Sequence, residues 1–209
     1  MLHLFAYLES FSLGECIGIS YVDSTPLRIC SNRRIHQHKT FKDIAQRGQC
    51  SIGSFYGFKL HIICNNRGYL VNMTLTPENV NDRKPLTQKH LSINYGGGGK
   101  LFGDKGYISK QLFNELFGQE VPLITKLKRN MKSTILSPML DAVSLRKRAI
   151  IEPIIDQLKN IYQVEHSRQR SPVNFFNNIF VALIAHNFND KKPSLKMQFR
   201  DTKQLYLPF

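Results

Sequence analysis

The chain has 209 residues, with 29 Lys or Arg against 15 Asp or Glu, and a formal net charge of +14 at pH 7. This length suits one domain with a sizeable core, and no stretch reaches the ~18 uninterrupted apolar residues of a membrane helix. The excess of positive charge favours a polyanionic partner, because each Lys or Arg placed on a phosphate releases condensed counterions. The four cysteines lack C-x-x-C spacing, which favours free thiols in a reducing cytoplasm over a zinc site.

The first part of the chain predicts a lead-in and then a strand that ends in an acid. Residues 1–16 form the lead-in, and the run from Ile17 to Val22 predicts a strand that delivers Asp23. Pro26 lacks a backbone N–H and is expected to stop the regular ladder. Residues 31–53 are polar and basic and predict a long loop.

Two strands and a helix follow. Alternating apolar side chains over residues 54–64, a turn at Asn65-Asn66-Arg67-Gly68 and an apolar run over 69–76 predict an antiparallel hairpin. Residues 77–92 predict a helix that Asn81 or Asp82 caps.

The stretch 100–107, with the sequence K-L-F-G-D-K-G-Y, follows a glycine-rich loop. A short apolar strand delivers Asp104 and then breaks at Gly106, which is a way to place a carboxylate at the edge of a sheet. Ser109 is expected to cap a helix over 109–117, and residues 121–127 predict another short strand.

Residues 139–162 predict a helix with one apolar stripe, and a second apolar helix is expected over 173–188. Arg148, Glu152, Asp156 and Lys159 share another face of the first helix, for which a solvated charged face is the simplest interpretation. Pro153 cannot donate to the helix ladder, so the helix is expected to kink there or to begin there with Glu152 as its cap.

The order of elements predicts an α/β fold. Its mixed sheet would combine a three-stranded antiparallel meander with parallel strands, and helices would cover both faces. Asp23 and Asp104 can then lie side by side at neighbouring strand ends, with the Glu152 helix packed across them. Singly, each such acid is more often a turn former. Three carboxylates without Cys or His suit Mg²⁺, and two such ions about 3.5–4 Å apart can promote phosphodiester cleavage.

Four motifs in the correct order resemble the DDE transposases of bacterial insertion sequences, in the broad IS4-like group and most similar to the IS982 family. The motifs are residues 22–26 (VDSTP), 56–61 (YGFKLH), 103–107 (GDKGY), and 150–160 (IIEPIIDQLKN) with the following 166–168 (HSR). The resemblance covers roughly residues 17–190 and implies an RNase H-like catalytic domain. Residues 1–16 would then be a lead-in remnant, and 191–209 a basic C-terminal tail.

Carried over by position, the resemblance implies that Asp23, Asp104 and Glu152 are catalytic and hold two Mg²⁺ or Mn²⁺ ions. The signature of this group has an Arg four residues before the Glu and a Lys seven after it, which are Arg148 and Lys159 here; its Tyr is replaced by Leu145. The predicted contacts to DNA are Arg148, Lys159, Lys105 and Lys59. The implied substrate is double-stranded DNA, namely the terminal inverted repeats and a target, cut and joined by a homo-oligomer in the bacterial cytoplasm at the nucleoid.

Two alternatives stay open. Relatives have a helical region before the first catalytic strand, whereas sixteen residues precede Ile17 here, so an N-terminally truncated copy is expected. Such a copy could be an inactive remnant that only binds DNA. The other alternative is a different RNase H-like nuclease, one that cuts branched DNA or RNA–DNA hybrids. Asp156 is the alternative third ligand.

Overall fold

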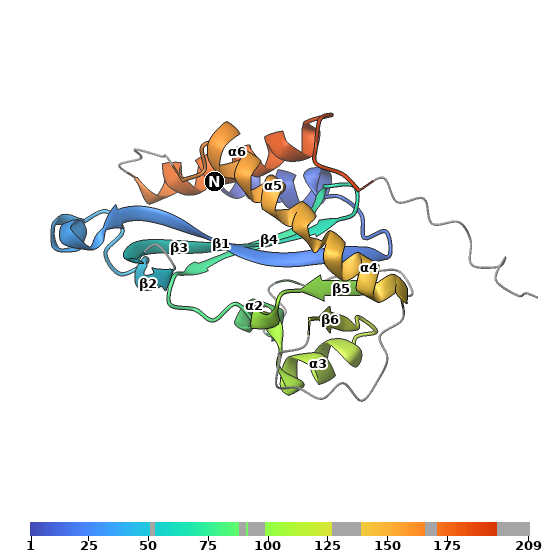
Figure 1. Ribbon diagram of the computed structural model, residues 1–209. Coiled ribbons are helices and arrows are strands. Elements are labelled where there is room, and N and C mark those ends of the chain that lie inside the picture. The colour runs from blue at the N-terminus through green and yellow to red at the C-terminus, as the bar shows by residue number, and fades with distance from the viewer. Residues whose placement is uncertain (51–52, 88–90, 92–98, 127–138, 166–170, 196–209) are drawn as a thin grey trace, which may run out of the picture.

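A six-stranded mixed sheet forms the centre of the computed structural model (Figure 1). The structure describes residues 1–50, 53–87, 91, 99–126, 139–165 and 171–195. Its strands are β1 (Ile19–Ser31), β2 (Gln46–Cys50), β3 (Gly53–Asn65), β4 (Leu70–Pro77), β5 (Lys100–Gly103) and β6 (Leu123–Thr125). Its α-helices are α1 (Leu2–Tyr7), α2 (Lys84–Thr87), α3 (Lys110–Phe117), α4 (Met139–Lys147), α5 (Ile151–Asp156) and α6 (Pro172–Phe188). Its short 3-10 or π segments are η1 (Leu8–Ser12), η2 (Asn32–Gln37), η3 (Lys105–Tyr107), η4 (Arg148–Ile150) and η5 (Gln157–Ile161).

The strand order confirms the predicted fold class. The sheet runs β2-β3-β1-β5-β6, and β4 also pairs with β3. Strands β1, β3 and β4 form the antiparallel meander, while β5 pairs parallel with β1 and β6 pairs parallel with β5. A meander extended on one side by parallel strands is the arrangement of the RNase H-like fold.

Helices cover both faces of the sheet, as expected (Figure 1). On one face, α5, α6 and η1 enclose the larger core, to which Tyr21, Phe58 and Ile179 contribute. On the other face, Val22 and Ile63 pack with Leu112 of α3. Side chains that alternate along β1 and β3 therefore pack into a core on each face of the sheet, instead of one face packing and the other facing solvent. Within the described part of the chain, no helix is long and apolar enough to cross a membrane.

Strand β1 is longer than the sequence indicated. It continues eight residues beyond Asp23, and Pro26 pairs in register with Lys59 of β3, so the expectation that Pro26 ends the strand is wrong. Strand β5 pairs only with Ile19–Tyr21, which leaves the rest of β1 as an edge on that side among the described residues. Proline is tolerated in edge strands because no neighbour there requires its N–H.

The prediction of a loop over residues 31–53 is also wrong for most of this segment. It contains η2 and β2, and β2 pairs antiparallel with the first half of β3. Phe41, between them, is 2% exposed and packs against Phe58 and Phe175, with ring centroids 6.0 and 5.2 Å away. This segment is therefore docked on the main core.

The predicted hairpin and the predicted cap of α3 are confirmed, and the predicted helix over 77–92 is present only in part. The hairpin is present as β3 and β4, with Gly68 at φ +80° in the turn, a conformation that favours glycine. Ser109 caps α3, because its hydroxyl accepts the backbone N–H of Leu112. The helix expected over 77–92 is reduced to α2 in its described part, and Asn81 accepts the N–H of Arg83 just before it; residues 88–90 and 92 lie outside the described residues.

The buried imidazole of His61 makes stability depend on pH. It lies 2.9 Å from Thr76 Oγ1, and burial lowers its pKa to about 4. The unfolded chain takes up this proton near pH 6.5, so the folded state loses up to about 3 kcal/mol as pH falls from 6.5 to 4. Chemical denaturation of the wild type and of His61→Gln at both pH values measures this loss.

The comparison with the variant is needed because burial raises the pKa of Glu78 to about 7, which gives the opposite pH dependence. Glu78 is present in both proteins, so the difference between them isolates His61. A difference that does not change with pH would contradict the assignment.

Candidate active site

Two of the predicted acids lie just beyond the stretch in which β1 and β5 pair parallel, Asp23 within β1 and Asp104 directly after β5. Tyr21 of β1 pairs with Phe102 of β5, and Asp23 and Asp104 each come two residues later in their strands' direction. The parallel register therefore places these two carboxylates level with each other. The Asp23 side chain is 26% exposed and that of Asp104 is 53% exposed.

The third acid comes from the helical run over residues 139–161, which crosses the sheet near these strand ends (Figure 1). The run changes from α4 through the 3-10 turn η4 into α5, which begins at Ile151. Pro153 therefore falls in the first turn of α5, where a missing N–H is tolerated. The expectation that Glu152 caps this helix is wrong, because Ile150 occupies the cap position. The Glu152 side chain is 68% exposed.

One guanidinium brings the three acids together. Nη1 of Arg148 lies 2.9 Å from Oδ2 of Asp23. Its Nη2 lies 3.9 Å from Oδ1 of Asp104 and 4.0 Å from Oε1 of Glu152. Since the last two oxygens lie near the same nitrogen, they can be no farther apart than the sum of these two distances. The structure thus gathers the three predicted catalytic carboxylates around one cation.

Opposing effects act on the charge of Asp23. Burial raises its pKa, and the negative charge of Asp104 acts in the same direction. The backbone N–H of Ser24, which donates to Asp23 Oδ1 at 2.8 Å, and the guanidinium of Arg148 lower the pKa. The backbone N–H of Ser24 and the cation Arg148 together favour the ionised form of this half-buried group.

The three acids suit a divalent metal in kind, because Mg²⁺ and Mn²⁺ prefer hard oxygen ligands. As they stand, the described residues contain no group of three His, Cys, Asp or Glu arranged to hold a metal ion. Arg148 lies between the carboxylates, and the exposed side chains of Asp104 and Glu152 have room to rotate. A metal that binds here would replace Arg148 as the neighbour of these oxygens.

Asp156, the alternative third ligand, lies one turn beyond Glu152 and makes a different contact. It is exposed and accepts a hydrogen bond of 2.6 Å from Asn160, one turn further along. Its carboxylate forms no ion pair with Arg148, which contacts the other three acids.

The four basic residues predicted to contact DNA lie in different settings. Arg148 is at the centre of the acidic group, and Lys105 is exposed beside Asp104. Lys159 pairs with Glu165 at 2.9 Å. Lys59 points to the opposite face of the sheet, where its ammonium lies 2.9 Å from Asp82 and donates to the carbonyl of Val80 at 3.0 Å. Of these four, Arg148 is the one that contacts the three acids.

Sequence reasoning assigned no role to Tyr107, which lies beneath the site. It is 2% exposed, and its ring packs so closely on Gly103 that a Cβ there would approach it to 3.2 Å. Burial raises its pKa well above the ordinary range, with Asp23 contributing in the same direction, so the phenol stays neutral. Its place in the G-D-K-G-Y motif was the only signal in the sequence.

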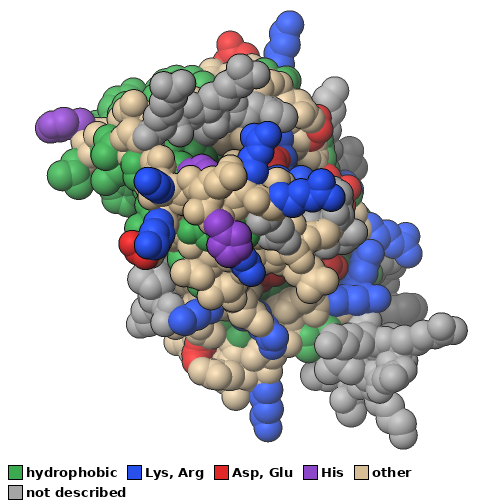
Figure 2. All heavy atoms as spheres, turned by 90° about the vertical axis from the view of Figure 1, so that its left-hand side faces the viewer, with side chains coloured by type: hydrophobic (Ala, Val, Ile, Leu, Met, Phe, Trp, Pro, Cys, Tyr) green, Lys and Arg blue, Asp and Glu red, His purple; other side chains and the backbone are tan. Residues whose placement is uncertain are grey.

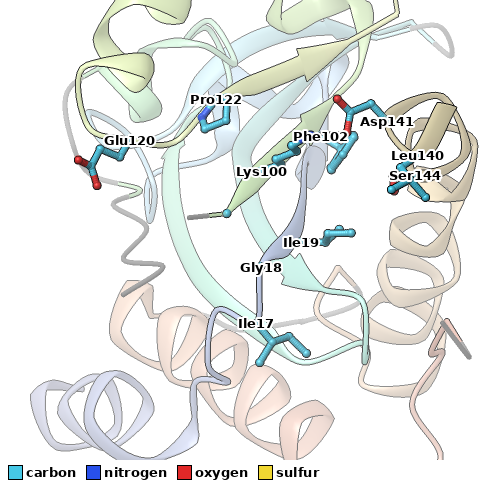
Figure 3. A pocket seen from close by; sticks show the side chains of 11 residues that line it. Ile17, Gly18, Ile19, Lys100, Phe102, Glu120, Pro122, Leu140, Asp141 and Ser144 are labelled. Atoms are coloured by element: carbon cyan, nitrogen blue, oxygen red, sulfur yellow. Dashed lines mark hydrogen bonds and ion pairs between the residues drawn. The ribbon is translucent and has the colours of Figure 1, made fainter. Parts of the chain in front are cut away.

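A cavity of about 470 Å³ lies at the other end of the parallel strands (Figure 3). Its wall includes Ile17 and Gly18 before β1, Lys100 at the start of β5, and Leu140 and Asp141 of α4. None of the three gathered acids lines it. This cavity is therefore separate from the acidic group.

A family model of the transposase DDE domain matches residues 13–172. The chain belongs to this family. The matched range contains all three acids of the gathered group as well as Arg148. No curated protein sequence matches this DDE domain.

Two solved structures are similar to this DDE domain. One is the simian T-cell lymphotropic virus intasome in complex with the PP2A regulatory subunit B56 gamma, with 12% identity, a TM-score of 0.39, and coverage of 88% of this chain and 56% of that chain. The other is the piggyBac transposase synaptic complex with hairpin DNA, with 10% identity, a TM-score of 0.49, and coverage of 81% and 47%. The chain thus spans about half the length of the structures that it matches.

Proposed function

We propose that this DDE domain cleaves and joins double-stranded DNA at the ends of a bacterial insertion sequence of the IS4-like group, closest to the IS982 family. The observation that supports this most directly is the gathering of Asp23, Asp104 and Glu152 around Arg148. The three acids are the catalytic residues of the proposal and hold two Mg²⁺ or Mn²⁺ ions.

Each residue of the site has a distinct part in this proposal. The bound ions would supply the charge that activates a water or hydroxyl and stabilises the leaving oxygen. Asp23, the most buried of the three acids, would fix the position of the ions, while Asp104 and Glu152 close around them. Arg148 and Lys105 would hold phosphate oxygens of the DNA.

The proposal assigns residues 17–190 to the catalytic domain. The lead-in packs on this domain, since Leu8 is fully buried and the ring of Phe5 lies 5.5 Å from that of Phe180 in α6. The substrates are the terminal inverted repeats and a target DNA, bound by a homo-oligomer at the bacterial nucleoid.

A nicking assay tests the proposed activity. The protein is expected to nick a supercoiled plasmid that carries the ends of the element, only when Mg²⁺ or Mn²⁺ is present, and a chelator should stop the reaction. DNA binding without any nicking would instead indicate an inactive remnant. Preferential cleavage of branched DNA or RNA–DNA hybrids would indicate a different nuclease.

A further inference from the structure

We propose that the end of β1, η2 and β2 form a rigid arm that grips duplex DNA about 25 Å from the catalytic carboxylates. The basic arm is defined as residues 28–50. This inference rests on the proposed function, because it takes duplex DNA to be the substrate of the site whose Asp23 lies in β1, the strand that leads into the arm. It assigns a role to the segment that the sequence predicted as a loop.

Charge is the first support for this surface. Over residues 24–50 the chain has one acid, Asp43, while six Lys or Arg side chains are exposed, namely Arg28, Arg33, Arg34, Lys39, Lys42 and Arg47. None of the six forms an ion pair with a carboxylate of the described residues. Figure 2 shows this end of the molecule, where Lys and Arg side chains are spread over the visible face with scattered acids among them.

The arm is held in place by the core. Phe41 and Ala45 are 2% and 1% exposed, and the hydroxyl of Tyr56 donates to the carbonyl of Phe41 at 2.8 Å. The whole of β2, from Gln46 to Cys50, pairs with β3. The cations are therefore presented on an ordered framework, which lowers the entropy lost when they bind a polyanion. A solvated loop of the same composition would not have this advantage.

The length of β1 sets the distance between the arm and the acids. Asp23 and Ser31 both lie in β1, whose pairing with β3 shifts register between Arg28 and Cys30, and eight residues at about 3.3 Å each span at most roughly 26 Å. Figure 1 shows the arm at the end of β1 that points away from β5 and α4. One base pair of B-DNA rises about 3.4 Å, so a duplex that follows β1 would reach the arm roughly eight base pairs from the cleaved phosphate.

Two matched variants of the full chain test the arm. The first is Arg33→Gln/Arg34→Gln/Lys39→Gln, and the control is Lys110→Gln/Lys126→Gln/Lys191→Gln, which removes the same charge from exposed positions elsewhere. Fluorescence anisotropy with a labelled 30-base-pair duplex, without metal, gives the binding constant over a range of salt concentrations. The arm variant should bind at least ~10-fold more weakly, with a slope of log K against log salt smaller by about two to three. The control variant should stay close to the wild type.

Duplex length provides the second readout. With a duplex that extends only about four base pairs from a nick, the wild type and the arm variant should bind alike; with one that extends about sixteen, only the wild type should gain affinity. Equal weakening of both triple variants, or no weakening of the arm variant, would overturn the proposal. This binding assay needs no cleavage, so the two proposals can fail separately. Arm-dependent binding without nicking would contradict the proposed function but support the arm. Nicking with binding that does not depend on the arm would support the proposed function but contradict the arm.

Discussion

Asp23→Asn is expected to lower the rate of metal-dependent nicking by on the order of 10²–10³-fold. The substitution preserves the shape of the half-buried side chain but removes the negative charge nearest to Arg148. Asp104→Asn and Glu152→Gln should have effects of similar size, because each removes one charged oxygen ligand from the same group. The initial rate of plasmid nicking at a fixed Mg²⁺ concentration measures all three.

The matched control is Asp156→Asn, on the same helix as Glu152. Asp156 is bonded to Asn160 and makes no ion pair with Arg148, so this variant should nick at the wild-type rate. If Asp156→Asn were inactive while Glu152→Gln kept its activity, the third ligand would be Asp156. An unchanged rate in any one of the other variants would remove that residue from the site.

Arg148→Gln should make the metal-free protein less stable and increase the stability that Mn²⁺ adds. Arg148 is 18% exposed and lies within 4.0 Å of an oxygen of each of the three acids. Without it the carboxylates repel one another, and the lost charge-assisted contacts should cost about 2 kcal/mol. A metal ion would then relieve this repulsion without having to replace the guanidinium. The measurement is the free energy of unfolding in urea, with a chelator and with Mn²⁺.

Lys159→Gln serves as the control for this experiment. It breaks the ion pair of Lys159, a residue on the same helical run as Arg148, with Glu165, and it involves none of the three acids. This variant should change the stability of the protein but not the increment due to Mn²⁺. The proposed place of the metal would be wrong if Arg148→Gln and the wild type gained the same stability from Mn²⁺.

Local patterns in the sequence predicted much of the fold. The hairpin β3–β4, the cap of α3 at Ser109 and the strand β6 follow from turn residues and side-chain periodicity, which act over a few positions. The three acids could be proposed because each stands in a short motif whose order along the chain is specific. The parallel pairing of β1 with β5 brings Asp23 and Asp104 side by side, while Glu152 joins them from α5.

Partners that are distant in the chain decided the rest. Pro26 can lie within a strand only because β5 pairs with three residues of β1, and residues 46–50 form a strand only because β3 offers them an edge. Lys59 forms an ion pair with Asp82 on the opposite face of the sheet, and no short motif predicts this pair. The same is true of Arg148, whose contact with Asp23 joins residues 125 positions apart.

By itself, the sequence determined the class of fold and the DDE transposase family and led to the proposal of the three acids, because these depend on local periodicity and on short motifs in a fixed order. Only the tertiary structure decided that a guanidinium stands among the acids and that a basic segment is docked as an arm. Both depend on long-range packing, since a side chain's partner is set by which elements pack together and not by its neighbours in the chain.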